Sequence, residues 1–213
     1  MSHLLEPLFS AVIDVLNQGG VWAVFFLMIL ESACIPAPSE LIMLYAGYLV
    51  ASDQVSGVSQ QWQGFVLVVV AGVAGNLIGS LIAWQIGASG GRTLLERHGK
   101  WFHISTKHLD WADSWFERHG PGTVFWTRVM PIIRTFISLP AGVARMPLHQ
   151  FTLYTLLGCI PWVAMLGAIG WAMGDQWEKA RDLLHYGDYL MVVAILAGLT
   201  WLVLRRRKSA RPQ

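Results

Sequence analysis

Four ionisable side chains lie within stretches of sequence that are otherwise apolar. Glu31 and Glu40 flank the segment SACIPAPS, and Arg128 and Arg134 flank the segment VMPII. A charge at the centre of a bilayer costs about 2.5–3.5 kcal/mol on insertion scales. Such charges are expected to pair with one another or to line a wet cavity, and they commonly mark a substrate or proton path.

The types of these four side chains suggest a chemistry. Arginine stays charged and binds a phosphate or a carboxylate through two parallel hydrogen bonds, so Arg128 and Arg134 are predicted to bind a phosphate. A carboxylate removed from water becomes easier to protonate, so Glu31 and Glu40 are predicted to load and release protons. The alternative is that the four charges only stabilise the structure around the two proline-containing segments SACIPAPS and VMPII.

The composition indicates what kind of protein carries these charges. Of the 213 residues, 54% are hydrophobic and 13% are charged, and the mean hydropathy is +0.49. A soluble domain has about 25% charged residues, and the 11 Trp residues are typical of the membrane interface. The chain is therefore predicted to be an integral membrane protein, and its net charge of +2 indicates no particular partner.

Three apolar segments are predicted to cross the membrane as helices. They are residues 64–88, 151–173 and about 189–204, each near the ~20 residues that a bilayer needs. Residues 1–19, with apolar side chains at helical spacing, are predicted to form an amphipathic helix on the membrane surface.

Two further apolar runs, residues 20–51 and 121–146, do not suit a single straight helix. Each has prolines in its interior, which remove a backbone donor and clash with the preceding turn. These are Pro36 and Pro38 in the first run and Pro131 and Pro140 in the second. Each run is predicted to be a re-entrant hairpin of two half-helices that enters and leaves on one side. Broken backbone at that depth is tolerated only where protein or water surrounds it.

The basic residues predict the orientation. The tail RRRKSARPQ and the segment 89–120, which carries five Lys or Arg residues, are both assigned to the cytoplasm. The first hairpin then opens to the outside and the second to the inside. The predicted fold is an all-α membrane protein with two inverted-topology repeats, each a re-entrant helical hairpin plus a transmembrane helix, followed by an extra C-terminal transmembrane helix.

A short echo in the sequence agrees with a repeat. Pro36 and Gly47 precede Pro131 and Gly142 by the same 95 positions, and an Ala stands before each of the two glycines. The domain boundaries that follow are a surface helix at 1–19 and a membrane domain at 20–175, in which 89–120 is a cytoplasmic amphipathic segment. Residues 176–213 form the last helix and the basic tail.

The segments ESACIPAPSELIMLYAG and GTVFWTRVMPIIRTFISLPAGVARMP together resemble the DedA family, whose core is the VTT domain shared with the SNARE-associated Golgi proteins. The resemblance covers about residues 20–175. It implies a transporter or scramblase that moves undecaprenyl phosphate or a phospholipid across the bacterial cytoplasmic membrane. On the family pattern, Glu31 and Glu40 match its acids, Arg128 and Arg134 its arginines, and the glycines after each hairpin match Gly47 and Gly142.

Several assignments stay open. Arg145 is predicted either to contact the lipid headgroup or to anchor the chain at the cytoplasmic face, and Asn76 either to join two helices or to bind substrate. Cys34 and Cys159 have no disulfide or metal-ligand spacing, and the histidines of 89–120 match no zinc pattern. No metal or cofactor is expected beyond protons as the coupling ion, no nucleic acid is expected, and a homodimer is compatible with the sequence.

Two rival functions follow from the same residues. A membrane lipid phosphatase would use the arginines, but it needs a nucleophile or a base beside them, and Thr127, Thr135 and Ser138 are the only hydroxyls nearby. A proton-coupled exporter of cationic compounds would use the two acids and leave the arginines unexplained.

Overall fold

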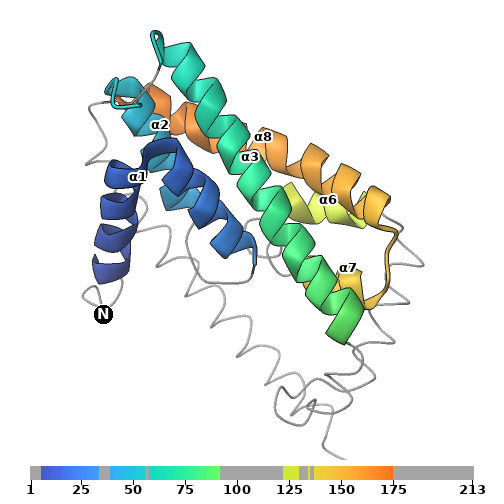
Figure 1. Cartoon of the computed structure of the whole chain (residues 1–213). Helices are drawn as coiled ribbons and strands as arrows, with labels where there is room; N and C mark the ends of the chain where they lie inside the picture. Colours follow the sequence, from blue (N-terminus) through green and yellow to red (C-terminus); the bar gives the residue numbers. More distant parts are fainter. Residues whose placement is uncertain are drawn as a thin grey trace, which may run out of the picture. The chain divides into compact units, whose positions relative to one another are not determined.

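The computed structural model describes residues 6–33, 39–55, 58–91, 122–129, 134 and 137–174. The regular elements among them are all helical (Figure 1), and they are α1 (Glu6–Ser32), α2 (Ser39–Ala51), α3 (Gln61–Ile86), a π-helical turn (Gly87–Gly91), α6 (Gly122–Val129), α7 (Ser138–Val143) and α8 (Leu148–Met173). The predicted all-α class is confirmed for this part of the chain.

Three of these helices are long and apolar enough to cross a membrane: Phe9–Ser32, Gln61–Ser89 and Leu148–Met173. The latter two correspond to the predicted spans 64–88 and 151–173, and each begins three residues earlier than expected. Large apolar side chains remain exposed along them, including Val70 on α3 and Leu153 on α8, as expected of helices that contact lipid. The predicted span at 189–204, the basic tail and most of the segment 89–120 lie outside the described residues.

A sharp kink at Gly20 divides α1. Gly20 has φ of 50° and ψ of −130°, values that are not helical and that glycine adopts with less strain than other residues. The kink separates residues 6–19 from 21–32, at the boundary between the predicted surface helix and the predicted first hairpin. The position of the first part on a membrane surface stays a prediction.

Each of the two runs that contain prolines holds two helices. The first run contains the end of α1 and all of α2, and the second contains α6 and α7. Pro140 is the third residue of α7, in the first turn, where proline leaves no intrahelical bond unmade. Pro36, Pro38 and Pro131 lie outside the described residues, and the re-entrant path of both runs stays a prediction.

Glycines on α3 and α8 let neighbouring helices approach closely. A Cβ atom on Gly75 of α3 would collide with the carbonyl oxygen of Phe25 and with the side chain of Met28, both on α1. A Cβ atom on Gly170 of α8 would collide with the carbonyl oxygen of Leu44 on α2. Small residues at such crossings are typical of helix packing within membranes.

The same two contacts recur with residues further along the chain. Gly158 of α8 lies against the Phe125 carbonyl oxygen and the Arg128 Cβ of α6, and Gly87 lies against the Leu139 carbonyl oxygen of α7. The shift in residue number is 100 from α1 to α6, 95 from α2 to α7 and 83 from α3 to α8. In both sets, the third helix packs against the first helix of its own set and against the second helix of the other.

Candidate functional site

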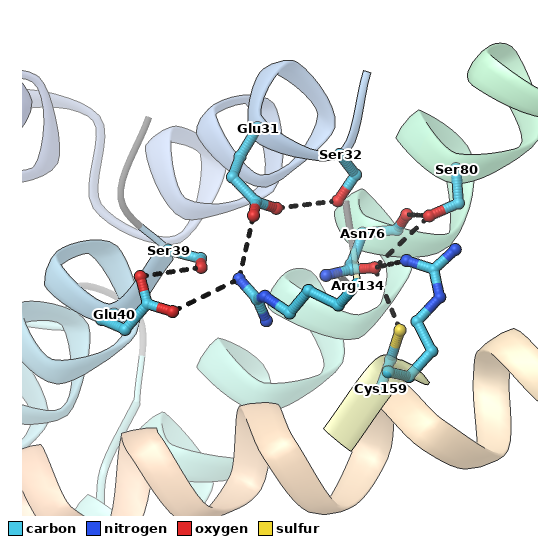
Figure 2. Close-up of polar contacts among 9 residues, drawn as sticks. Glu31, Ser32, Ser39, Glu40, Asn76, Ser80, Arg134 and Cys159 are labelled. Atoms are coloured by element: carbon cyan, nitrogen blue, oxygen red, sulfur yellow. Dashed lines mark hydrogen bonds and ion pairs between the residues drawn. The ribbon is translucent and has the colours of Figure 1, made fainter. Parts of the chain in front are cut away.

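Three of the four predicted charged residues meet in one buried cluster. Glu31 is the penultimate residue of α1, Glu40 is the second residue of α2, and Arg134 lies between α6 and α7. Figure 2 shows Arg134 reaching toward both carboxylates: its Nη2 is 2.9 Å from Glu31 Oε1 and 3.9 Å from Glu40 Oε1. The first distance is that of a charge-assisted hydrogen bond, whereas the second is an ion pair without one.

The two carboxylates differ in their surroundings. Glu31 has a side chain that is 7% exposed, and its Oε2 accepts a hydrogen bond of 3.0 Å from Ser32 Oγ. Glu40 is 27% exposed and accepts a longer bond of 3.4 Å from Ser39 Oγ. Glu40 also lies in the first turn of α2, where the helix dipole favours a negative charge, whereas Glu31 lies in the last turn of α1, where it does not. Glu31 therefore depends more on Arg134 than Glu40 does.

Arg128 is the last but one residue of α6 and is 2% exposed. Its Nη2 donates a hydrogen bond of 2.8 Å to Ser138 Oγ at the start of α7, and its Nη1 lies 3.5 Å from Asn76 Oδ1 on α3. Its guanidinium carbon is 5.9 Å from the centre of the Phe151 ring on α8. Arg128 is therefore held by α3 from the first set of helices and by α7 and α8 from the second.

Asn76 joins α3 to α8 beside this arginine. Its Oδ1 accepts a hydrogen bond of 3.0 Å from Cys159 Sγ, and its backbone carbonyl accepts one of 2.7 Å from Ser80 Oγ. Asn76 is 2% exposed and Cys159 is a buried free cysteine. Asn76 thus joins two helices, and it also lies within reach of an arginine that was predicted to bind substrate.

The two arginines lie over two aromatic rings of α8. Arg128 is above Phe151, and the guanidinium carbon of Arg134 is 5.3 Å from the centre of the Trp162 ring. Phe151 and Trp162 are eleven residues apart, about three turns, so they lie on nearly the same face of the helix. Arginine over an aromatic face gains a cation–π attraction of about 0.5–2 kcal/mol, so α8 supports both guanidinium groups.

The remaining predicted residues have different positions. Gly47 and Gly142 lie at close helix crossings: a Cβ atom on Gly47 would collide with the Gly167 carbonyl oxygen, and one on Gly142 with the Trp84 carbonyl oxygen. Arg145 follows α7 with φ of 50° and is exposed. No contact among the described residues joins Arg145 to the buried cluster.

Four residues of this site were not predicted from the sequence as site residues. Cys159 was noted only for its lack of disulfide or metal-ligand spacing, Ser138 was noted only as a hydroxyl near the arginines, and Phe151 and Trp162 were not singled out. Trp162 carried a usable signal, because it stands in the middle of a span, whereas tryptophan is enriched at the ends of spans.

Comparison with known proteins identifies the family. The VTT domain model matches residues 35–172. Undecaprenyl phosphate transporter A of Bacillus subtilis is 34% identical over 173 residues, which cover 81% of this chain and 83% of that protein. An alkaline phosphatase-like protein of Lactococcus lactis is 32% identical over 197 residues, covering 90% and 87%. Protein DedA of Escherichia coli is 26% identical over 207 residues, covering 93% and 90%.

No solved structure matches this chain. Its three candidate spans and its relatives make it a multi-pass membrane protein. The resemblance that rested on the two proline-containing motifs is confirmed by a domain model that covers the second motif completely and the first from residue 35 onward. The chain belongs to the VTT-domain family as a DedA family membrane protein.

Proposed function

We propose that the protein transports a lipid phosphate, either undecaprenyl phosphate or a phospholipid, across the bacterial cytoplasmic membrane, and that proton movement drives this transport. Arg128 and Arg134 bind the phosphate, and Glu31 and Glu40 exchange protons. The observation that carries the proposal is the buried ion pair of Arg134 and Glu31, 2.9 Å long, among helices that are otherwise apolar. The relatives named undecaprenyl phosphate transporter A support the same class of substrate.

The charges of the site suggest how proton and substrate are coupled. Two arginines and two glutamates sum to zero net charge at neutral pH, and a buried charge is costly unless it is compensated. A phosphate that binds to Arg134 competes with Glu31 for the same guanidinium group. If Glu31 gains a proton when the phosphate takes its place on Arg134, one negative charge replaces another and the buried charges stay compensated. Phosphate binding is then accompanied by proton uptake.

The matched helix contacts support two inverted repeats, with α1, α2 and α3 in one and α6, α7 and α8 in the other. Constant shifts of 100, 95 and 83 positions relate the two sets of glycine contacts. Arg134 then comes from the second repeat, and both glutamates come from the first. A site made from both repeats near the midplane is the arrangement expected of a secondary transporter that opens to each side in turn.

The proposal is tested by translocation of a labelled lipid phosphate in proteoliposomes, with and without a pH gradient. We expect Arg128→Lys and Arg134→Lys to lose most transport, because an ammonium group cannot donate the paired hydrogen bonds of a guanidinium. Arg145→Lys is the matched control, since it makes the same change at an exposed position. Full activity in both buried Lys variants would contradict phosphate binding by the arginines.

The role of the acids is tested in the same vesicles. Glu31→Gln and Glu40→Gln keep the shape of the side chain but do not titrate, so we expect phosphate binding to remain and the pH dependence of transport to be lost. Asp53→Asn, an exposed residue between α2 and α3, is the control for the same chemical change. Unchanged rates and unchanged pH profiles in both Gln variants would show that the acids are structural.

A phosphatase is the second candidate, because two relatives are named alkaline phosphatase-like. Ser138 Oγ lies 2.8 Å from Arg128 Nη2 and would be the nucleophile. Among the described residues, no contact joins Ser138 to a histidine or carboxylate that could act as its base. Release of inorganic phosphate from a lipid phosphate by the purified protein, abolished in Ser138→Ala, would favour this second function over transport.

A further inference from the structure

The ring of Trp162 lies under Arg134, one of the two arginines of the phosphate site that is proposed above, and its indole N–H is buried. We propose that it is a third phosphate donor beside Arg134, so that the bound phosphate contacts α8 as well as the arginines. This inference rests on the proposed function and assigns a substrate-binding role to a residue in the middle of α8. Its consequence is that the phosphate headgroup, at the depth of Trp162, is recognised by a neutral donor in addition to cations.

The first support is a pair of hydrogen-bond donors without acceptors. Arg134 Nε and Trp162 Nε1 are both buried, and neither has a partner among the described residues. They belong to groups in contact, since the guanidinium carbon is 5.3 Å from the centre of the indole ring. Buried tryptophan N–H groups usually find a partner, and an unpaired buried donor costs about 1–3 kcal/mol. Two such donors at one place indicate a site for an acceptor-rich group.

The second support is the residue at the corresponding position of α3. The shift of 83 positions from α3 to α8 places Trp162 opposite Gly79. A Cβ atom on Gly79 would collide with the Ile29 carbonyl oxygen and lie 2.7 Å from Ser32 Cβ, so glycine allows the last turn of α1 to pack directly on α3. On α8, the indole of Trp162 occupies the equivalent place, and Arg134 lies over it. Close helix packing therefore does not explain a tryptophan at position 162. A tryptophan there is explained if its ring supports Arg134 and its N–H donates to the phosphate that Arg134 binds.

The third support is the chemistry of the ligand. A phosphate monoester has three strong acceptor oxygens, more than one arginine engages through a single pair of hydrogen bonds. Arg134 Nη2 is bonded to Glu31, so its free Nε and the indole N–H are the donors that an incoming oxygen finds unengaged. A phosphate bound there begins to displace Glu31 from the guanidinium group, which is the exchange that proton coupling requires.

The test is equilibrium binding of a fluorescent polyprenyl monophosphate to the full-length protein in detergent micelles, with the corresponding polyprenyl alcohol as a second probe. Trp162→Phe keeps an aromatic ring under Arg134 but removes the N–H. We expect it to weaken binding of the phosphate about tenfold, the loss typical of one hydrogen bond to a charged group, and to leave binding of the alcohol unchanged.

Trp84→Phe is the matched control. Trp84 also has a buried Nε1 without a partner among the described residues, but it is stacked on Phe151 and not under Arg134. We expect this variant to bind both probes like the wild type. If Trp162→Phe unfolds at a lower temperature than the wild type does, Trp162→Met is measured beside it, since methionine adapts to an irregular apolar site and has no N–H or O–H donor in its side chain.

The outcomes separate this inference from the proposed function. If the wild type binds the phosphate no better than the alcohol, the proposed function fails and this inference fails with it. If the wild type prefers the phosphate and the Trp162 variants bind it equally well, only the role of Trp162 is wrong. Equal losses in the variants of Trp162 and Trp84, or an equal loss for both probes, would show a packing effect and would also overturn it.

Discussion

The unequal surroundings of the two glutamates predict unequal effects on stability. Removal of one partner from a buried ion pair costs about 3–5 kcal/mol when the remaining charge is left alone. Glu31→Gln costs less, about 1–3 kcal/mol, because glutamine still accepts from Arg134 and Glu40 remains 3.9 Å away. Glu40→Gln costs below about 1 kcal/mol, since Glu40 is 27% exposed and makes no hydrogen bond to Arg134.

The double variant gives the sharper result. With both acids replaced, Arg134 loses both of its carboxylate partners in the described structure, and we expect the full loss of about 3–5 kcal/mol. That loss exceeds the sum of the two single losses, because each single variant keeps one carboxylate near the guanidinium group. The free energy of unfolding is measured by titration with a denaturing detergent in mixed micelles, with Asp53→Asn as the control.

Two results would refute this reasoning. A loss for Glu40→Gln that equals or exceeds the loss for Glu31→Gln would show that Arg134 prefers the more exposed acid. Strict additivity would show that the two carboxylates do not share one cation. Either result would also weaken the proposed exchange of Arg134 between acid and phosphate.

Three further predictions concern packing, electrostatics and topology. Gly170→Ala should destabilise the protein by about 1–3 kcal/mol through overpacking, whereas Gly122→Ala, with open space around it, should not; equal unfolding curves would contradict the close crossing. Asn76→Asp places a carboxylate about 3.5 Å from an arginine, so transport should fall about tenfold at neutral pH and recover on acidification; a wild-type pH profile would exclude this contact. Single cysteines at Ser52 and Gln150, without the two native cysteines, should react with an impermeant reagent from outside and inside respectively, and labelling from one side would contradict inverted repeats.

The sequence alone predicted the class of fold and the main helices. Long apolar runs with few charges favour helices in a membrane because every backbone group must be bonded within the segment. This reasoning located α3 and α8 to within about three residues at their N-terminal ends. The prolines of the two broken runs predicted interruptions in the helices, because proline acts on the backbone locally. The predicted boundary between residues 1–19 and 20–51 coincides with the kink at Gly20.

The same reasoning found the charged residues, since Glu31, Glu40, Arg128 and Arg134 are costly wherever an apolar segment places them. It also predicted that these charges would pair with one another or line a wet cavity. It could not decide which pairs would form, because Glu31 and Arg134 are 103 positions apart and no local rule relates them. From the sequence, the two arginines were predicted to have the same role, the binding of a phosphate. In the structure they have different neighbours: Arg134 lies beside two carboxylates, and Arg128 lies beside Ser138 and Asn76.

Tertiary structure alone decided the partners of the neutral residues. Asn76 was noted in the sequence as a polar residue of an apolar segment, but its bond to Cys159 arises from the crossing of α3 with α8. Trp162 gains its place in the site because the segment between α6 and α7 lays Arg134 over it. The crossing of α3 with α8 depends on contacts between residues far apart in the chain, such as Gly72 with Val163. Helix positions follow from local chemistry, but the directions in which their side chains meet follow from packing between distant segments, which no short stretch of sequence specifies.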